Sequence, residues 1–472
     1  MLRDSAIYIL SRVIPAGLGF ATGMALTWLL TPEIYGIYGL GLTVVVLSSG
    51  VFFDWLGLSF MRFYQANAEN PIFMPTVARI FLLLCLASGL VAAAACLTGL
   101  VPQDYVPLVA ISLPGCWAFA WFELSARLQV ARFRPTRYFW MNLTRNLLIL
   151  LLGIAAAWAW HSAYSVLAAS FLSMLIAAVA FRAPGWRLMS RAYDPEIGRR
   201  LARFGWALAL VCAISAGSYA IDRVLLEAMI GTDAVGFYTV AYLLAQTSLM
   251  TIGAGIGSAT YSLAVRAVES GDAAEINRQL SRNSALLLAL LLPAAVGVAM
   301  VSPTLAQLFV DPDYVAPVAS LTAWMAFAAF FYGFRANYID HGFQLGHSTH
   351  GLLAVMVLAA AVNLGLDIVL IPRFGVVGAA AASLCASVVS VIHGWLAAQR
   401  VMRLPIALGD TAKVLAASAV MAAFLWPFHG HGGILVLLIE VGGGALVYGA
   451  ILLALDAMGL RNLLRQKLAQ RL

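Results

Sequence analysis

Apolar stretches of about 20 residues follow one another along almost the whole chain, separated by short polar turns. A helix of that length crosses the hydrocarbon core of a bilayer, which is about 30 Å thick. The pattern predicts an all-α polytopic membrane protein with about 14 transmembrane helices and no large soluble domain. The predicted spans are 7–30, 36–58, 77–99, 105–126, 139–160, 162–182, 205–229, 236–260, 284–303, 315–335, 351–372, 375–398, 411–429 and 433–456.

One stretch of the chain occurs twice. Residues 14–38, IPAGLGFATGMALTWLLTPEIYGIY, align with residues 214–238, ISAGSYAIDRVLLEAMIGTDAVGFY, after a shift of 200 positions. Both copies predict a long apolar helix, a tight polar turn and a second helix that opens on Gly-x-Tyr. Such a repeat in a membrane protein indicates two homologous bundles with a shared cavity. The identical pairs are Ile14 with Ile214, Ala16 with Ala216, Gly17 with Gly217, Leu26 with Leu226, Gly36 with Gly236 and Tyr38 with Tyr238.

Composition agrees with a membrane protein. Hydrophobic residues make up 62% of the chain, charged residues only 10%, and the mean hydropathy is +0.91, well beyond a soluble domain. The first apolar run has no clear cleavage site and contains Arg12, so we expect a retained helix rather than a secretory signal. All five cysteines fall in apolar runs, which favours buried thiols over a disulfide framework or metal site.

The net charge of +7 does not indicate nucleic-acid binding, because of where the basic residues lie. If the N-terminus is cytoplasmic, Arg373 is the only Lys or Arg in the predicted outer segments. By the positive-inside rule this places both termini in the cytoplasm. We expect the basic stretches at 127–137 and 183–204 and the tail RNLLRQKLAQRL to meet anionic headgroups.

Several charged residues fall inside or at the ends of the predicted spans. Burying a charge in a membrane costs free energy, so these residues are candidates for a function. Arg12 either snorkels to the inner surface or faces a wet cavity, and Arg62 is either a topology anchor or a cavity residue. Arg145 is about two turns deep, which makes snorkelling less favourable. Arg223 and Glu227, at i and i+4, either pair with each other or contact a ligand.

Three short motifs contain residues typical of binding sites but lack the neighbouring residues or elements that such sites require. GAGIGSA, residues 253–259, lies inside an apolar span, so we expect close helix packing rather than a phosphate loop. His347 and His350 have metal-like spacing but no nearby cysteine, and we expect no metal site. Asn363 and Asp367 share a helix face and are expected to cross-link helices.

Four stretches, in this order, carry a family resemblance: LLTPEIYGIYGL and GLSFMRFY in the first half, AIDRVLLEAMIGTDAVGFYTVAYLL in the second, and VNLGLDIVLIPRFGVVGAAAASL late. The chain resembles the multidrug/oligosaccharidyl-lipid/polysaccharide (MOP) exporter superfamily, and within it the polysaccharide flippases of the Wzx type. It departs from the family pattern at Asp367, where a second asparagine is common.

The resemblance implies a V-shaped fold of two six-helix lobes that open alternately to the two sides of the bacterial inner membrane. The lobes would be residues 1–200 and 201–400, with two further helices and a basic tail in 401–472. The implied function is translocation of undecaprenyl-pyrophosphate-linked oligosaccharide, without enzymatic chemistry or a cofactor. The implied partners are this lipid-linked glycan, membrane lipids, and polysaccharide polymerase and assembly proteins.

Guanidinium groups are permanently charged planar forks that match phosphate oxygens, and all basic residues except Lys413 and Lys467 are arginine. We therefore expect four arginines to face a cavity and hold the pyrophosphate, with a fifth as a weaker candidate. These are Arg12, Arg62, Arg145 and Arg335, followed by Arg223. Three acids, Asp54, Glu123 and Asp340, are candidates for ion coupling or for structural roles.

Other functions stay open. A lipid II flippase of the MurJ type would also have fourteen helices and a cationic cavity. A drug/cation antiporter is disfavoured because such proteins rely on buried acids and the first helix here carries none. A membrane enzyme is disfavoured because the outer connections are short, the longest being about 304–314. A non-transporting scaffold would tolerate loss of every cavity arginine.

Overall fold

The chain is all-helical wherever the structure describes it. The computed structural model describes residues 2–182 and 192–461, with side chains from residue 14 on except at 207, 247, 248 and 349. Within these residues it contains 13 helices long and apolar enough to cross a membrane, besides the first helix, of which 14–27 is fully described. The predicted fold class is confirmed. The basic connector at 183–191 and the tail from 462 lie outside the described residues.

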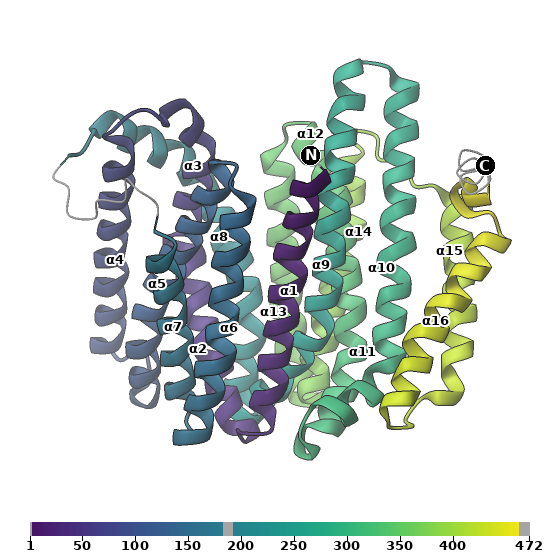
Figure 1. The fold of residues 1–472 in the computed structure, drawn as a ribbon, viewed down its shortest axis with the longest axis horizontal. Helices are drawn as coiled ribbons and strands as arrows, with labels where there is room; N and C mark the ends of the chain where they lie inside the picture. Colours follow the sequence, from purple (N-terminus) through teal and green to yellow (C-terminus); the bar gives the residue numbers. More distant parts are fainter. Residues whose placement is uncertain (1, 183–191, 462–472) are drawn as a thin grey trace. The chain divides into compact units, whose positions relative to one another are not determined.

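The chain divides into two compact units, Met1–Gly236 and Phe237–Leu472. In the first unit α2 packs against α5 and α8, and α6 packs against α1 and α7 (Figure 1). Because α8 packs on α2 and α3, it belongs with the first unit, beyond the residue 200 at which the sequence repeat restarts. The helices are α1 (Leu2–Thr27), α2 (Pro32–Phe52), α3 (Asp54–Tyr64), α4 (Phe73–Leu97), α5 (Val106–Ala131), α6 (Pro135–Trp160), α7 (Ala163–Ala180) and α8 (Pro195–Met229), with short 3₁₀ turns η1 (Gln65–Asn67) and η2 (Gln103–Tyr105).

The polar turns contain residues that cap the following helices. Thr31 is the N-cap of α2: its hydroxyl accepts a hydrogen bond from the Ile34 N–H, and Pro32 follows at the first helical position. Asp194 caps α8 in the same way, so residues 195–204 of the predicted polar connector are the first ten residues of that helix. These caps satisfy N–H groups that a helix leaves without partners.

The predicted helix 36–58 is two helices. The backbone is distorted at Phe53, with φ −118° and ψ −33°, so α2 ends at Phe52 and α3 begins at Asp54. At this position the Asp54 carboxylate accepts a hydrogen bond from the Ser49 hydroxyl at 3.0 Å. An acid in the first turn of a helix is favourable because of the helix dipole. Hydropathy could not show this break because the residues around it are apolar.

The two copies of the repeat touch each other at their turns. A Cβ atom on Gly36 would lie 2.0 Å from the backbone oxygen of Thr232, and one on Gly236 would lie 2.2 Å from the backbone oxygen of Pro32. Only glycine permits such an approach of two backbones. The repeated Gly-x-Tyr is therefore a reciprocal contact, in which each copy supplies the glycine that the other copy's turn packs against.

The second unit begins within α9 (Thr232–Ser270). It continues with α10 (Ala273–Phe309), α11 (Pro312–Phe334), a π-helical turn η3 (Arg335–Ile339), α12 (Asp340–Leu345), α13 (Thr349–Phe374), α14 (Val376–Ala398), α15 (Leu408–Leu425), the 3₁₀ turn η4 (Trp426–Phe428), α16 (Ile434–Ala454) and the 3₁₀ turn η5 (Ala457–Gly459). One apolar core includes α10, α11 and α14, and a second one joins α10 to α15 and α16.

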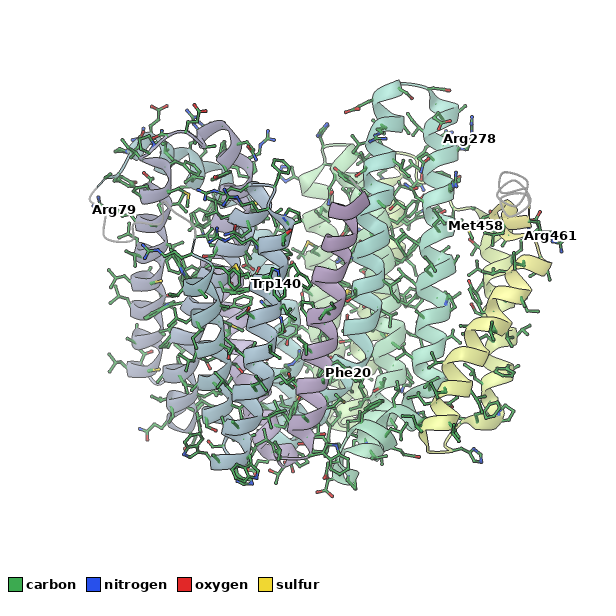
Figure 2. All side chains as sticks on the ribbon, in the orientation of Figure 1. Phe20, Arg79, Trp140, Arg278, Met458 and Arg461 are labelled. Atoms are coloured by element: carbon green, nitrogen blue, oxygen red, sulfur yellow. The ribbon has the colours of Figure 1, made fainter. Side chains whose placement is uncertain are left out.

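Helices α9 and α10 are longer than predicted and form a hairpin whose turn is capped by Asp272. Arg278 projects near this turn (Figure 2) and pairs with Glu275 at 3.2 Å, so the polar ends of these helices extend beyond the apolar spans. Gly253 and Gly257 of GAGIGSA face the side chain of Asn337; a Cβ on Gly257 would lie 2.1 Å from the amide oxygen. The predicted close packing holds for Gly253 and Gly257, whereas a Cβ on Gly255 would meet no atom within 4 Å.

Candidate functional site

Arg145 lies in the interior of the first unit. It is ten residues after the start of α6, or about 15 Å along the helix. One of its terminal nitrogens is 3.5 Å from a carboxylate oxygen of Glu123 on α5, and its guanidinium lies over the Phe122 ring, 4.5 Å from the centroid. Its Nε has no hydrogen-bond partner among the described residues. Arg145 is thus a half-buried cation with only one loose carboxylate partner.

A small cavity adjoins this pair. It has a volume of about 10 Å³, room for about one water molecule, and lies where α3, α4 and α5 meet. Asp54, Glu123 and Arg127 supply its polar walls, and the other lining residues are apolar or glycine. Two of the acids predicted to couple to an ion, Asp54 and Glu123, therefore line one cavity, and Glu123 joins it to Arg145.

Arg127 belongs to this group, although its sequence context indicated a headgroup-binding surface. Because α5 continues to Ala131, Arg127 is inside a helix, where its guanidinium donates to the backbone oxygen of Asp54 at 3.3 Å. Gly57 makes room for it: a Cβ there would lie 2.1 Å from an Arg127 terminal nitrogen. The i, i+4 spacing of Glu123 and Arg127 is the signal that could have revealed this role.

Arg335 forms a second charged group, in the second unit. It opens η3, and its side chain and that of Asp340 are only 6% and 12% exposed. Arg335 Nε is 3.9 Å from Asp340 Oδ2, too far for a hydrogen bond, and Tyr332 lies under the guanidinium at 5.1 Å. Neither Nε nor Asp340 Oδ1 has a hydrogen-bond partner among the described residues. Single π-turns are frequent at functional sites.

The other candidate arginines differ in setting. Arg62 is exposed in the last turn of α3. Arg223 is fully buried in α8, donates to the Tyr219 backbone oxygen at 2.9 Å and lies over the Tyr219 ring. The backbone of Arg12 lies in α1, but its side chain is outside the described residues.

Glu227, considered as a partner of Arg223, makes contacts that the sequence did not indicate. Its Oε1 accepts hydrogen bonds from the Tyr105 hydroxyl and, at 3.1 Å, from the Thr232 hydroxyl. The carboxylate therefore ties η2 to the turn between α8 and α9. The partners are 122 and 5 residues away, and only the short-range one is accessible to sequence reasoning.

These arrangements suit an anion better than a metal. Within the described residues, no group of three or more His, Cys, Asp or Glu side chains gathers. Arg145 and Arg335 instead present guanidinium N–H groups that their carboxylate partners do not use. Such N–H groups form strong charge-assisted hydrogen bonds with phosphate oxygens.

The chain matches two known protein families. Residues 1–261 match the family described as "Polysaccharide biosynthesis protein", and residues 136–453 match the family described as "Lipid II flippase MurJ". The chain belongs to the MOP superfamily. The resemblance of the four motif stretches to the MOP superfamily is confirmed, and the matches include both a polysaccharide and a lipid II family. A comparison with curated proteins gave no match.

Solved structures share the fold. A lipid II flippase MurJ in an inward closed conformation has a TM-score of 0.79 at 14% identity, covering 98% of this chain and 100% of its own. An inward-facing multidrug resistance MATE transporter has a TM-score of 0.65 at 15% identity, covering 84% and 98%. An outward-facing MATE transporter gives 0.56 at 14% identity, covering 84% and 94%. The protein is thus a multi-pass membrane protein of a superfamily whose named members are flippases and transporters.

Proposed function

We propose that the protein is a flippase that carries an undecaprenyl-pyrophosphate-linked oligosaccharide from the inner to the outer leaflet of the bacterial inner membrane, with both termini in the cytoplasm. The observation that supports this most is the state of Arg145 and Arg335. Each is a permanent cation inside an apolar span, paired loosely with one acid and left with an N–H group that has no hydrogen bond among the described residues.

The energetics favour an anionic lipid as the cargo. Moving a bare charge into hydrocarbon is far more costly than burying a polar group that keeps its hydrogen bonds, so a pyrophosphate crosses a membrane only when cations accompany it. Arg145 and Arg335 supply such cations, and their pairing with Glu123 and Asp340 limits the cost of burying them while the site is empty. No bond in the lipid has to be made or broken, which agrees with transport rather than enzymatic chemistry.

A cationic drug is a poorer cargo for these sites. It would have to lie beside guanidinium groups, and the acids that might attract it, Glu123 and Asp340, already face arginines at 3.5 and 3.9 Å. Like charges inside a site of low dielectric repel strongly. We therefore place a drug antiporter behind a flippase despite the shared fold with MATE transporters.

Lipid II is the second candidate substrate. The match to the family described as "Lipid II flippase MurJ" covers residues 136–453, which include both Arg145 and Arg335. Lipid II also joins a pyrophosphate to an undecaprenyl chain, so both candidates present the same charged group to the arginines. The two candidate lipids differ in their sugars, whereas Arg145 and Arg335 are proposed to bind the pyrophosphate that both lipids share.

The test is lipid translocation in proteoliposomes. Wild-type protein should move fluorescent undecaprenyl-pyrophosphate oligosaccharide across the bilayer, whereas Arg145→Ala and Arg335→Ala should slow it about tenfold or more, since a hydrogen bond to a charged group contributes about 1.5–3 kcal/mol. Arg278→Ala is the matched control, because Arg278 is exposed near a helix turn. If the protein moves only lipid II, lipid II is the substrate instead of the proposed oligosaccharide lipid. If it moves neither lipid, the proposal is wrong.

A further inference from the structure

Glu440 is a buried acid that the proposed function does not use. It lies in the second turn of α16 and is 1% exposed, on the side that packs against α10. Neither carboxyl oxygen has a hydrogen-bond partner by geometry among the described residues. An ionised carboxylate without a partner is very costly in such a place, and an acid inside a membrane span is therefore a candidate functional group.

The surroundings of Glu440 are polar but offer no strong partner. Thr304 of α10 and the two histidines of the turn between α15 and α16, His429 and His431, face the carboxyl. This turn is fastened to α10: the Thr304 hydroxyl donates to the His431 backbone oxygen at 3.2 Å, and His429 Nδ1 lies 3.0 Å from the Met300 backbone oxygen. Both histidine side chains are exposed.

Among the described residues, the charged side chains of the two helices packed against α16 lie far along those helices from Glu440. The charged residues of α10, namely Glu275, Arg278 and Arg282, lie at its other end. Asp410 and Lys413 of α15 are likewise at the far end of that helix, where they bond the backbone of Met458 and Asp456. His429 and His431 are thus the titratable neighbours that decide the charge around Glu440.

Burial decides which form of Glu440 fits. Both carboxyl oxygens are shielded from solvent, and neither has a hydrogen-bond partner among the described residues. The Thr304 hydroxyl is hydrogen-bonded to the His431 backbone oxygen at 3.2 Å. A neutral carboxyl is far less costly than a carboxylate in such a place, so the protonated acid fits this pocket better than the ionised acid.

We propose that Glu440 is a proton-binding site that controls the docking of α16 on α10. With the proton bound, the neutral carboxyl lies between the helices; when the proton leaves, the charge favours separation of α16 or entry of water. The docked state is thus fully favoured at low pH and is lost as pH rises. His429 and His431 connect the site to the aqueous phase. This site is independent of which lipid is carried.

Infrared spectroscopy of the reconstituted protein tests the proton directly. The wild type should show the carbonyl band of a neutral carboxylic acid that vanishes at high pH, and Glu440→Gln should lack it. Glu275→Gln, at an exposed acid of α10, is the matched control and should keep the band. Thr304→Val should shift the band, because it removes the hydroxyl beside the carboxyl. Glu440→Asp, which retains a carboxyl, should show a shifted band and gives a second readout if the amide does not insert.

Hydrogen exchange tests the consequence for the helix. Amide exchange in α16 should accelerate as pH rises beyond the intrinsic pH dependence, and Glu440→Gln should abolish the excess. Identical wild-type and Glu440→Gln spectra in the neutral-acid region at every pH would overturn the proton site. A neutral acid combined with pH-independent docking would overturn the control of α16. Neither measurement requires transport, so failure here is separate from failure of the flippase proposal.

Discussion

Arg145 shows how a charge can be kept inside a membrane protein and remain available. Its contact with Glu123 is long, at 3.5 Å, and both side chains keep some exposure, 19% and 34%. The contact is thus weaker than a buried, well-aligned ion pair, and Phe122 covers the guanidinium face instead. Arg335 has the same kind of setting, with Asp340 at 3.9 Å and Tyr332 beneath it. A phosphate can replace such partners at low cost.

We predict that Glu123→Gln tightens the binding of an undecaprenyl pyrophosphate by a few fold, because the acid competes with the phosphate for Arg145. Half-exposed ion pairs contribute about 0.2–1 kcal/mol, which sets the size of the effect. The measurement is equilibrium binding in detergent. Glu196→Gln, at an exposed acid paired with Arg200, should leave affinity unchanged. A loss of affinity in Glu123→Gln would mean instead that Glu123 holds Arg145 in its binding orientation.

At the scale of helices, the sequence pattern predicted where apolar segments lie but not how their backbones vary. The hydropathy pattern does not reveal the break at Phe53 or the π-turn at 335–339, because both occur within apolar surroundings. It also missed the length of α9 and α10, whose polar ends continue as helix beyond the apolar spans. Thr31, Asp194 and Asp272 each cap the helix that follows, and such caps are a signal that hydropathy does not contain.

The reciprocal glycine contact of the repeat gives a prediction at this scale. Gly36→Ala and Gly236→Ala should each lower stability by about 1–3 kcal/mol, because a methyl group cannot fit against the opposing backbone oxygen. Thermal unfolding in detergent should show this as a lower midpoint. The control is Gly217→Ala, whose added Cβ meets no atom within 4 Å in α8 and improves helix propensity. Equal midpoints for all three variants would contradict the close approach.

At the scale of the molecule, composition and hydropathy sufficed to predict a helical membrane protein, and the resemblance of four motif stretches pointed to the MOP superfamily. The pairing of charged residues could not be predicted in the same way. Glu123 and Arg145 are on different helices, 22 residues apart, and no periodicity in one sequence reports which faces of two helices meet. Arg127 was assigned to the membrane surface because its neighbours are basic, whereas the continuation of α5 brings it to Asp54. The cytoplasmic location of both termini stays a prediction.

The central claim is that arginines inside the membrane spans hold the pyrophosphate of the carried lipid. The most direct measurement is the affinity of purified protein for undecaprenyl pyrophosphate, compared among wild type, Arg145→Ala, Arg335→Ala and the surface control Arg278→Ala. We predict that each of the first two substitutions weakens binding about tenfold or more and that the control binds as the wild type does. Wild-type affinity in both interior variants would contradict the account.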